Sequence, residues 1–234
     1  MPVSLNLENR HHRKFKEGLM FQIANNEKVS VLVQTRCSHT SMFHFLGLQG
    51  FDTRENDTLE SWINSPNRVV VLRHPIERMH SAIEVYDTQI KILIDHYDAQ
   101  TDKAKFIEQL RQRNPQHTGY FIENYFNIPD RNEVRDRLTF LVHSYPYMSH
   151  IVDYDFEIIK FENIEKYLPS RDDPIFFGAP KSGITKQSNR TYLEFPHNNY
   201  YTEAELLREV ELYNTIIESK TEISVADWQS LITH

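Results

Sequence analysis

The sequence predicts an α/β fold in which a parallel sheet carries helices on both faces. Short apolar runs rich in β-branched residues alternate along the chain with patterns of helical period. Two of these runs, at 29–34 and 68–72, pass directly into an amphipathic helix. The Val-Val-Val-Leu sequence of the second run indicates a strand that is buried on both faces. Strands that alternate with helices favour a parallel sheet, and such sheets bind ligands at the carboxyl ends of their strands.

The first part of the chain is predicted to form, in order, a helix, a strand, a helix, a helical turn and a strand, at 15–24, 29–34, 41–48, 59–63 and 68–72. The clearest helix follows, because apolar side chains recur at spacings of three and four from Ile76 to Leu93. Pro75 stands where a first helical residue tolerates proline. Ser81 falls on the opposite face, so we expect it to meet ligand or water.

In the second part of the chain, helices are predicted at 102–113, 121–127, 131–141, 164–168 and 227–232, and a strand at 156–161. The segment 172–196 is irregular. A capping box, Thr202-Glu-Ala-Glu205, opens a further helix. One face of that helix carries Leu206, Val210, Tyr213 and Ile217.

Composition limits the partners that we expect. The formal net charge is −7 and no basic stripe is present, so a nucleic-acid partner is not expected. The single cysteine, Cys37, allows no intramolecular disulfide, which fits a reducing compartment. No apolar run reaches membrane length and the N-terminus is polar. We therefore expect a cytoplasmic protein with no membrane partner.

The two strand-to-helix junctions are the strongest functional signal. Each places backbone N–H groups, hydroxyls and a guanidinium at a helix N-terminus, which favours a phosphate or sulfate. Two such sites about forty residues apart predict a ligand with two separated anionic groups. A nucleoside-triphosphate P-loop is not indicated, because no Gly or Lys lies between Thr35 and Ser41.

These junctions resemble the donor-binding motifs of sulfotransferases. Arg36-Cys-Ser-His-Thr-Ser41 is similar to the family's 5′-phosphosulfate loop, and Arg73-x-Pro-x-x-Arg-x-x-Ser81 to its 3′-phosphate motif. Further similarities to the carbohydrate (Golgi-type) branch lie at His143-x-x-Pro146, at 158–168 and at 200–213, so that the resemblance covers about 29–217. The resemblance implies a soluble relative with a three-layer, P-loop-like domain. We expect a single domain over 1–234, with an N-terminal extension at 1–27 and a helical insertion on the acceptor side at 95–150.

The resemblance also implies a cofactor and roles for individual residues. The donor would be 3′-phosphoadenosine 5′-phosphosulfate (PAPS), and the acceptor a small molecule or a glycan. The residues implied to bind PAPS are Arg36, Cys37, Ser38, His39, Thr40, Ser41, Arg73 and Ser81. Arg36 would act as an electrostatic clamp on the charge that develops during transfer, and no metal would be needed.

A general base must accept the proton of the acceptor hydroxyl, and histidine suits that task near neutral pH. His143 is the first choice because of its motif. Glu55 or Glu60 come second, and His39 or His44 third. A catalytically inactive adenosine-bisphosphate-binding protein is an alternative function, because His39 stands where the family prefers a small residue. A divergent P-loop small-molecule kinase is another. The sequence carries no code for the acceptor or the oligomeric state.

Overall fold

The computed structural model describes residues 21–37, 39–53, 59–85, 90–113, 122–130, 133–134, 144–169 and 203–233. Within these ranges one four-stranded sheet is present, with the strands in the order β1 (Phe21–Asn25), β2 (Ser30–Gln34), β3 (Arg68–Leu72) and β4 (Glu157–Lys160). β2, β3 and β4 are parallel, whereas β1 is an antiparallel edge strand. The predicted α/β class is therefore confirmed, although the sheet is mixed rather than wholly parallel.

The helix predicted at 15–24 is wrong over its described part, because Phe21–Asn25 forms β1. Pairing with β2 overrides the local apolar pattern, with Phe21 opposite Gln34. The turn that joins the two strands is stabilised by Asn26, whose Oδ1 accepts from the backbone N–H groups of Lys28 and Val29 at 2.8 and 2.7 Å. Such an asparagine turn is a common hairpin connection. The sheet thus begins inside the segment expected as an N-terminal extension.

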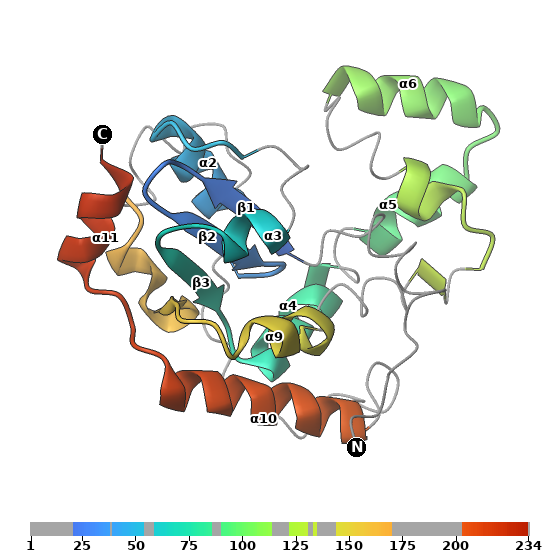
Figure 1. Ribbon diagram of the computed structural model, residues 1–234. Helices are drawn as coiled ribbons and strands as arrows, with labels where there is room; N and C mark the ends of the chain where they lie inside the picture. The colour runs from blue at the N-terminus through green and yellow to red at the C-terminus, as the bar shows by residue number, and fades with distance from the viewer. Residues whose placement is uncertain are drawn as a thin grey trace. The chain divides into compact units, whose positions relative to one another are not determined.

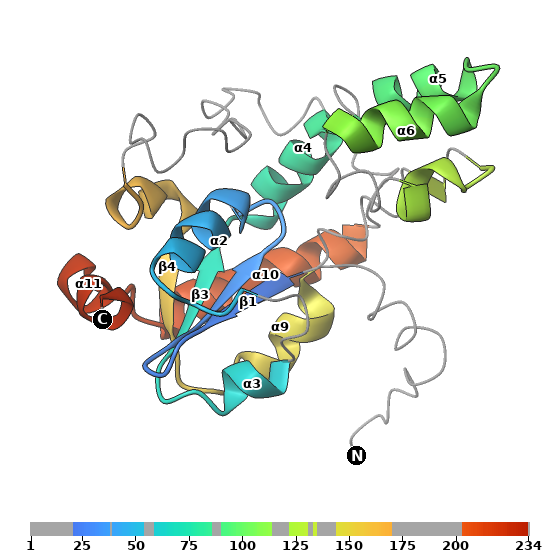
Figure 2. The ribbon, with the colours of Figure 1, turned by 90° about the horizontal axis from the view of Figure 1, so that it is seen from above.

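The contacts divide the chain into two compact units, 1–78 with 141–234, and 79–140. The helices of the first unit are α2 (His39–Leu48), α3 (Leu59–Ile63), α9 (Tyr145–Ile151), the 3₁₀ helix η3 (Phe161–Lys166), α10 (Glu203–Ser219) and α11 (Val225–Ile232). A further helix, α4 (Pro75–Val85), crosses the boundary between the units. Figures 1 and 2 show helices on both faces of the sheet, with α2 on one side and α3 and α9 on the other.

The core of the first unit lies against the sheet. On the α2 side, the buried apolar residues include Val31, Val33, Val69, Val71, Ile159, Met42, Leu46 and Trp228. On the α3 side, Trp62 is fully buried and its Nε1 donates to Val69 O at 3.2 Å. Both faces of the parallel strands are therefore covered, as the continuous apolar run of β3 predicted.

The second unit contains α5 (Lys91–Asp98), α6 (Lys103–Arg113) and the π-helical turn η2 (Ile122–Phe126). Tyr97 links them, because its ring stacks on Phe126 with centroids 4.5 Å apart and also contacts Phe106. The helix predicted over 76–93 is described as α4 and α5, and 86–89 lie outside the described residues. The helix predicted at 131–141 also lies mostly outside them. The single domain with an insertion at 95–150 stays a prediction.

Other predicted elements are confirmed with small shifts at their ends, including both strands that precede the junctions. The helix α9 was not predicted, and Pro146 stands at its start. On α10 the predicted apolar face is only partly buried, and the most buried residues of the helix are Ile216 and Glu209.

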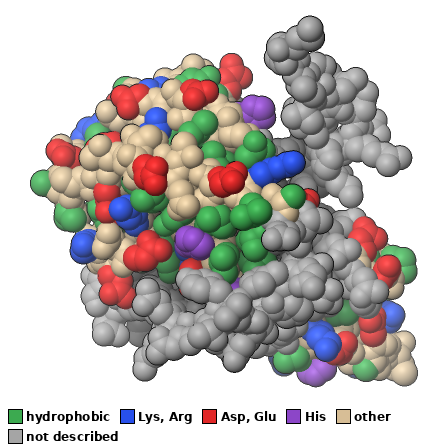
Figure 3. All heavy atoms as spheres, turned by 90° about the horizontal axis from the view of Figure 1, so that it is seen from below, with side chains coloured by type: hydrophobic (Ala, Val, Ile, Leu, Met, Phe, Trp, Pro, Cys, Tyr) green, Lys and Arg blue, Asp and Glu red, His purple; other side chains and the backbone are tan. Residues whose placement is uncertain are grey.

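No helix in the described part of the chain is long and apolar enough to cross a membrane. Figure 3 shows a face on which the described acidic and basic side chains are interspersed.

Candidate functional site

The two junctions begin at the same edge of the sheet. β2 and β3 are neighbouring parallel strands, with Val33 paired to Val71. The segments that follow the two strands therefore leave the sheet at the same edge. Arg73, which directly follows β3, donates from Nη1 to the backbone oxygen of Arg36 at 3.2 Å. The two segments that the sequence singled out are therefore in direct contact.

The first loop turns sharply after β2. Cys37 N donates to Gln34 O at 3.1 Å, and Arg36 has a φ of 67°. Among the described residues, Arg36 is the only residue other than glycine with positive φ. A side chain in this left-handed region is uncommon, and such strain is typical of functional loops. Ser41 is half-buried at the start of α2, whereas Ser38 and the side chains of His39 and Thr40 lie outside the described part.

Arg73 is a buried cation, only 8% exposed. Its guanidinium carbon lies 4.2 Å from the centroid of the Phe161 ring, and its Nη2 lies 3.5 Å from Glu77 Oε2. Nε is buried and has no hydrogen-bond partner in the described part of the protein. A guanidinium carries five N–H donors. This group can therefore still donate to an anionic ligand that reaches the sheet edge.

Ser81 was predicted on the face of α4 that meets ligand or water, but it is buried. Arg78, three residues earlier on the same helix, is buried as well. Arg78 and Ser81 are only 1% and 7% exposed, because α4 is buried on more than its apolar stripe. Arg78 donates from Nη1 to Gln34 Oε1 at 2.7 Å, and its Nη2 lies 3.7 Å from Glu209 Oε2. The charge of Arg78 is therefore balanced inside the protein. Ser81 belongs to the second unit, and its role in binding stays a prediction.

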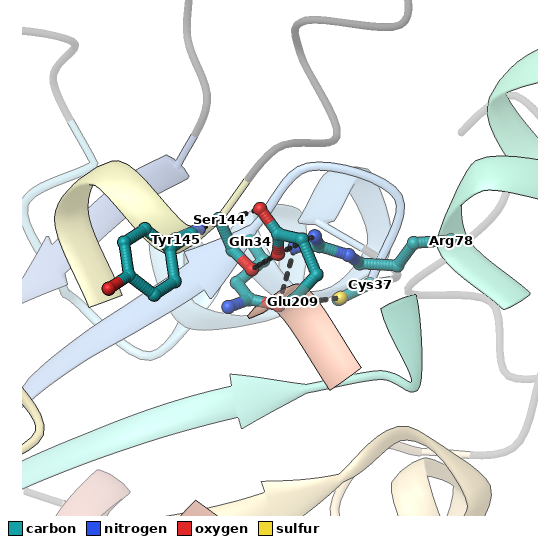
Figure 4. Close-up of polar contacts among 6 residues, drawn as sticks. All are labelled: Gln34, Cys37, Arg78, Ser144, Tyr145 and Glu209. Carbon is teal, nitrogen blue, oxygen red and sulfur yellow. Dashed lines mark hydrogen bonds and ion pairs between the residues drawn. The ribbon is translucent and has the colours of Figure 1, made fainter. Parts of the chain in front are cut away.

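A buried carboxylate, Glu209 of α10, joins this arginine to the start of α9. Ser144 Oγ donates to Glu209 Oε2 at 2.5 Å, and Tyr145 N donates to Glu209 Oε1 at 2.8 Å. In Figure 4 the carboxylate lies between Ser144 and the guanidinium of Arg78. Sequence reasoning missed Glu209. The signal available was its spacing, three residues after Leu206 and four before Tyr213, which places a carboxylate on the apolar face.

An imidazole and a phenol also meet near the end of β3. The rings of His74 and Tyr213 lie edge to face with centroids 5.1 Å apart. Burial lowers the pKa of His74, although the carboxylates of Glu77 and Glu162 oppose the effect. Burial likewise raises the pKa of Tyr213 to about 12. His74 is therefore a neutral imidazole at neutral pH, able to accept a proton. Sequence reasoning did not consider it, although it directly follows Arg73.

Other side chains that were predicted to bind or react have different surroundings. Cys37 is fully buried, and burial raises the pKa of its thiol to about 11, so it is a packing residue rather than a nucleophile. His44 and Glu60 are exposed on α2 and α3. The first-choice base, His143, and Glu55 lie outside the described residues. Within the described ranges, no group of three or more His, Cys, Asp and Glu side chains could hold a metal ion.

No protein-family model, no curated protein and no solved structure matches this chain. The described residues at this sheet edge make up the candidate site. Its parts are a buried guanidinium with a spare donor, a strained loop that opens a helix, and a neutral imidazole at the carboxyl edge of parallel strands. Such a site is suited to binding a phosphorylated or sulfated ligand and to accepting a proton from a second one.

Proposed function

We propose that this protein is a PAPS-dependent sulfotransferase with a P-loop-like, three-layer domain. It transfers a sulfuryl group in line, without a metal, to a hydroxyl of a carbohydrate or another small acceptor. The observation that carries the proposal is the hydrogen bond from Arg73 to the backbone of Arg36. It brings together two motifs that resemble the 3′-phosphate and 5′-phosphosulfate sites of one donor. The single cysteine is the ground for proposing a cytoplasmic location.

Arg73 would bind the 3′-phosphate of the donor. A guanidinium can offer two parallel N–H groups to a phosphate, and such charge-assisted bonds are roughly twice as strong as neutral ones. Its position over Phe161 and beneath other side chains keeps water away, which strengthens the attraction. The bond to Arg36 and the longer contact to Glu77 each use one N–H group, and Nε with the other N–H groups would bind the ligand.

The loop after β2 would bind the 5′-phosphosulfate. N–H groups at the start of α2, with the hydroxyls of Thr40 and Ser41, would bind the phosphate, as anions bind at helix N-termini. In the reaction the acceptor oxygen bonds to sulfur while the bond from sulfur to the bridging oxygen breaks. The electron pair stays on the 5′-phosphate of the leaving 3′-phosphoadenosine 5′-phosphate. Arg36 would stabilise that charge, since arginine cannot serve as a proton donor.

The acceptor proton goes to a base, for which His143 is the first candidate. His74 is the second, because burial keeps its imidazole neutral beside Tyr213. Replacing the true base should lower turnover and spare the affinity for the donor, since the base acts only during transfer. We predict this result for His143→Ala, measured as kcat beside the Kd of the bisphosphate product. If His143→Ala keeps full turnover and His74→Gln loses it, the base is His74.

The function is tested by incubating the protein with radiolabelled PAPS and a panel of hydroxylated sugars and small molecules. Labelled sulfate on an acceptor is expected, and Arg73→Ala should abolish most of it, whereas Arg111→Ala, an exposed arginine of α6, should not. Phosphate transfer from ATP with magnesium would instead support the kinase. Bisphosphate binding with no transfer to any acceptor would support the inactive binding protein.

A further inference from the structure

Glu209 occupies an unusual position for an acidic residue. It is 2% exposed, and its carboxylate contacts groups from two other elements, the guanidinium of Arg78 and the first residues of α9. A buried carboxylate is costly unless it is paired and hydrogen-bonded. Both of its oxygens are used, so the carboxylate is held in one orientation.

The first contact leads to the donor loop. Arg78 donates to the side-chain oxygen of Gln34, the last residue of β2. The same oxygen lies 3.8 Å from the Cys37 thiol, and the backbone oxygen of Gln34 accepts from Cys37 N. Gln34 therefore contacts Cys37 through both its side chain and its backbone, and these contacts stabilise the turn that contains Arg36. Glu209 in turn holds the arginine that orients Gln34.

The second contact leads to the segment of the predicted base. Ser144 and Tyr145 directly follow His143 in the sequence. Both donate hydrogen bonds to Glu209, which lies 65 and 64 residues further along the chain. The N-cap residue of α9, Ser144, makes no side-chain bond to its own helix. A distant carboxylate thus caps this helix in its place, which also suits the helix dipole.

A buried ion pair of this kind is weak evidence for stability alone. Replacing both partners by apolar residues of similar size is often neutral, whereas removing one leaves an uncompensated charge. We propose that Glu209 is the positioning residue of the site, whose carboxylate fixes the donor loop and the start of α9 relative to each other. This inference rests on the proposed function for the roles of the two segments, but the positions themselves can be tested without a ligand.

The first readout is the rate at which N-ethylmaleimide labels the native protein, because Cys37 is the single cysteine and is fully buried. Glu209→Gln keeps the side-chain shape but removes the negative charge opposite Arg78, which should loosen the turn at Gln34. We expect labelling to be about tenfold faster, the scale of one lost bond to a charged group. The control is Tyr167→Phe, which removes hydrogen bonds to Ile223 O at 2.7 Å and to Glu222 Oε1 at 3.3 Å, both in the segment between α10 and α11.

The second readout separates the two contacts. Glu209→Gln should weaken binding of 3′-phosphoadenosine 5′-phosphate about tenfold, measured by calorimetry well below the melting temperature. Ser144→Ala removes one of the two bonds between Glu209 and the start of α9 and does not touch Arg78, so it should lower kcat and leave that affinity unchanged. If Glu209→Gln does not fold, Arg78→Met/Glu209→Leu replaces it, because this pair removes both charges and the bond to Gln34 while keeping the core filled.

Equal labelling rates in the Glu209 variant and in Tyr167→Phe would overturn the inference, since a stabilising role alone would then suffice. Wild-type bisphosphate affinity in a folded Glu209 variant would overturn it as well. Failure of the wild-type protein to bind the bisphosphate would count against the proposed function instead. In that case the labelling rates alone decide whether Glu209 positions the loop.

Discussion

Arg73 makes three different contacts with a single guanidinium. Its guanidinium stacks on Phe161, donates to a backbone oxygen of the neighbouring loop and lies near a carboxylate at 3.5 Å. The cation is thus fixed in place but not fully paired. A buried charge with spare donors is costly in the ligand-free protein, and an anionic ligand would offset that cost. This is the reason for assigning it to ligand binding rather than to folding.

Glu77 is the residue that a phosphate must displace or tolerate. Because Glu77 lies four residues after Arg73 and its carboxylate is 3.5 Å from the guanidinium, it would repel an incoming phosphate. Glu77→Gln should therefore tighten bisphosphate binding about two- to fivefold, the scale of a partly exposed ion pair. Calorimetry compares it with Glu108→Gln, which changes an exposed pair of the same residue types on α6. Weaker binding in Glu77→Gln would show that the carboxylate helps to form the site.

His74 makes stability depend on pH. Its pKa is lowered in the folded state, first by burial, with Arg78 also lowering it and Glu77 and Glu162 raising it. The unfolded state therefore binds the proton more readily, so stability is present above about pH 6.5 and is lost as the pH falls below it. His74→Gln should reduce this loss in denaturant titrations at successive pH values, whereas the exposed His44→Gln should not. An unchanged pH profile in His74→Gln would contradict the assignment.

At the scale of single elements, α11 offers a test of local stability away from the site. Ser224 is its N-cap, and the Ser224 hydroxyl accepts from Asp227 N at 3.0 Å. Ser224→Ala should lower the free energy of unfolding by about 1 kcal/mol. Ser219→Ala at the end of α10, where the hydroxyl only donates back to Thr215 O, should have little effect. Both variants should bind the bisphosphate as the wild type does, and a large affinity loss in Ser224→Ala would mean that α11 belongs to the site.

The elements that sequence reasoning found are those with a strong periodic signal. β2 and β3 are apolar runs because both of their faces are buried, and this apolar pattern allowed the two strands to be predicted. β1 was missed because an antiparallel partner, not its own pattern, decides its structure. α9 was missed because part of its N-terminal stabilisation comes from Glu209, which is 64 residues away.

The candidate site was also predictable only in part. The meeting of Arg36 and Arg73 was predictable, since parallel neighbouring strands end at one edge. The network of Gln34, Arg78 and Glu209 was not, because each member is polar and the pairing that permits their burial is long-range. Periodicity assigns Arg78 to the face of its helix away from the core, and only the folded chain shows how the three side chains pair.

At the scale of the whole molecule, the C-terminal helices are tied to the sheet that supports the site. Ile158 N donates to Thr221 O at 2.9 Å, and Ile223 N donates to Ile158 O at 3.0 Å, so the segment between α10 and α11 pairs along β4. An edge strand covered in this way is protected from pairing with other chains. The same pairing holds the end of α10, the helix whose Glu209 reaches the candidate site.

Recognition of a 3′-phosphate by Arg73 can be tested by a calorimetric double comparison. Wild type, Arg73→Ala and the control Arg111→Ala are titrated with 3′-phosphoadenosine 5′-phosphate and with adenosine 5′-monophosphate. We predict that removing the guanidinium or the 3′-phosphate each weakens binding about 10- to 100-fold, and that both changes together weaken it no further. Equal wild-type affinity for the two ligands, or no binding of the bisphosphate at millimolar concentration, would contradict the account.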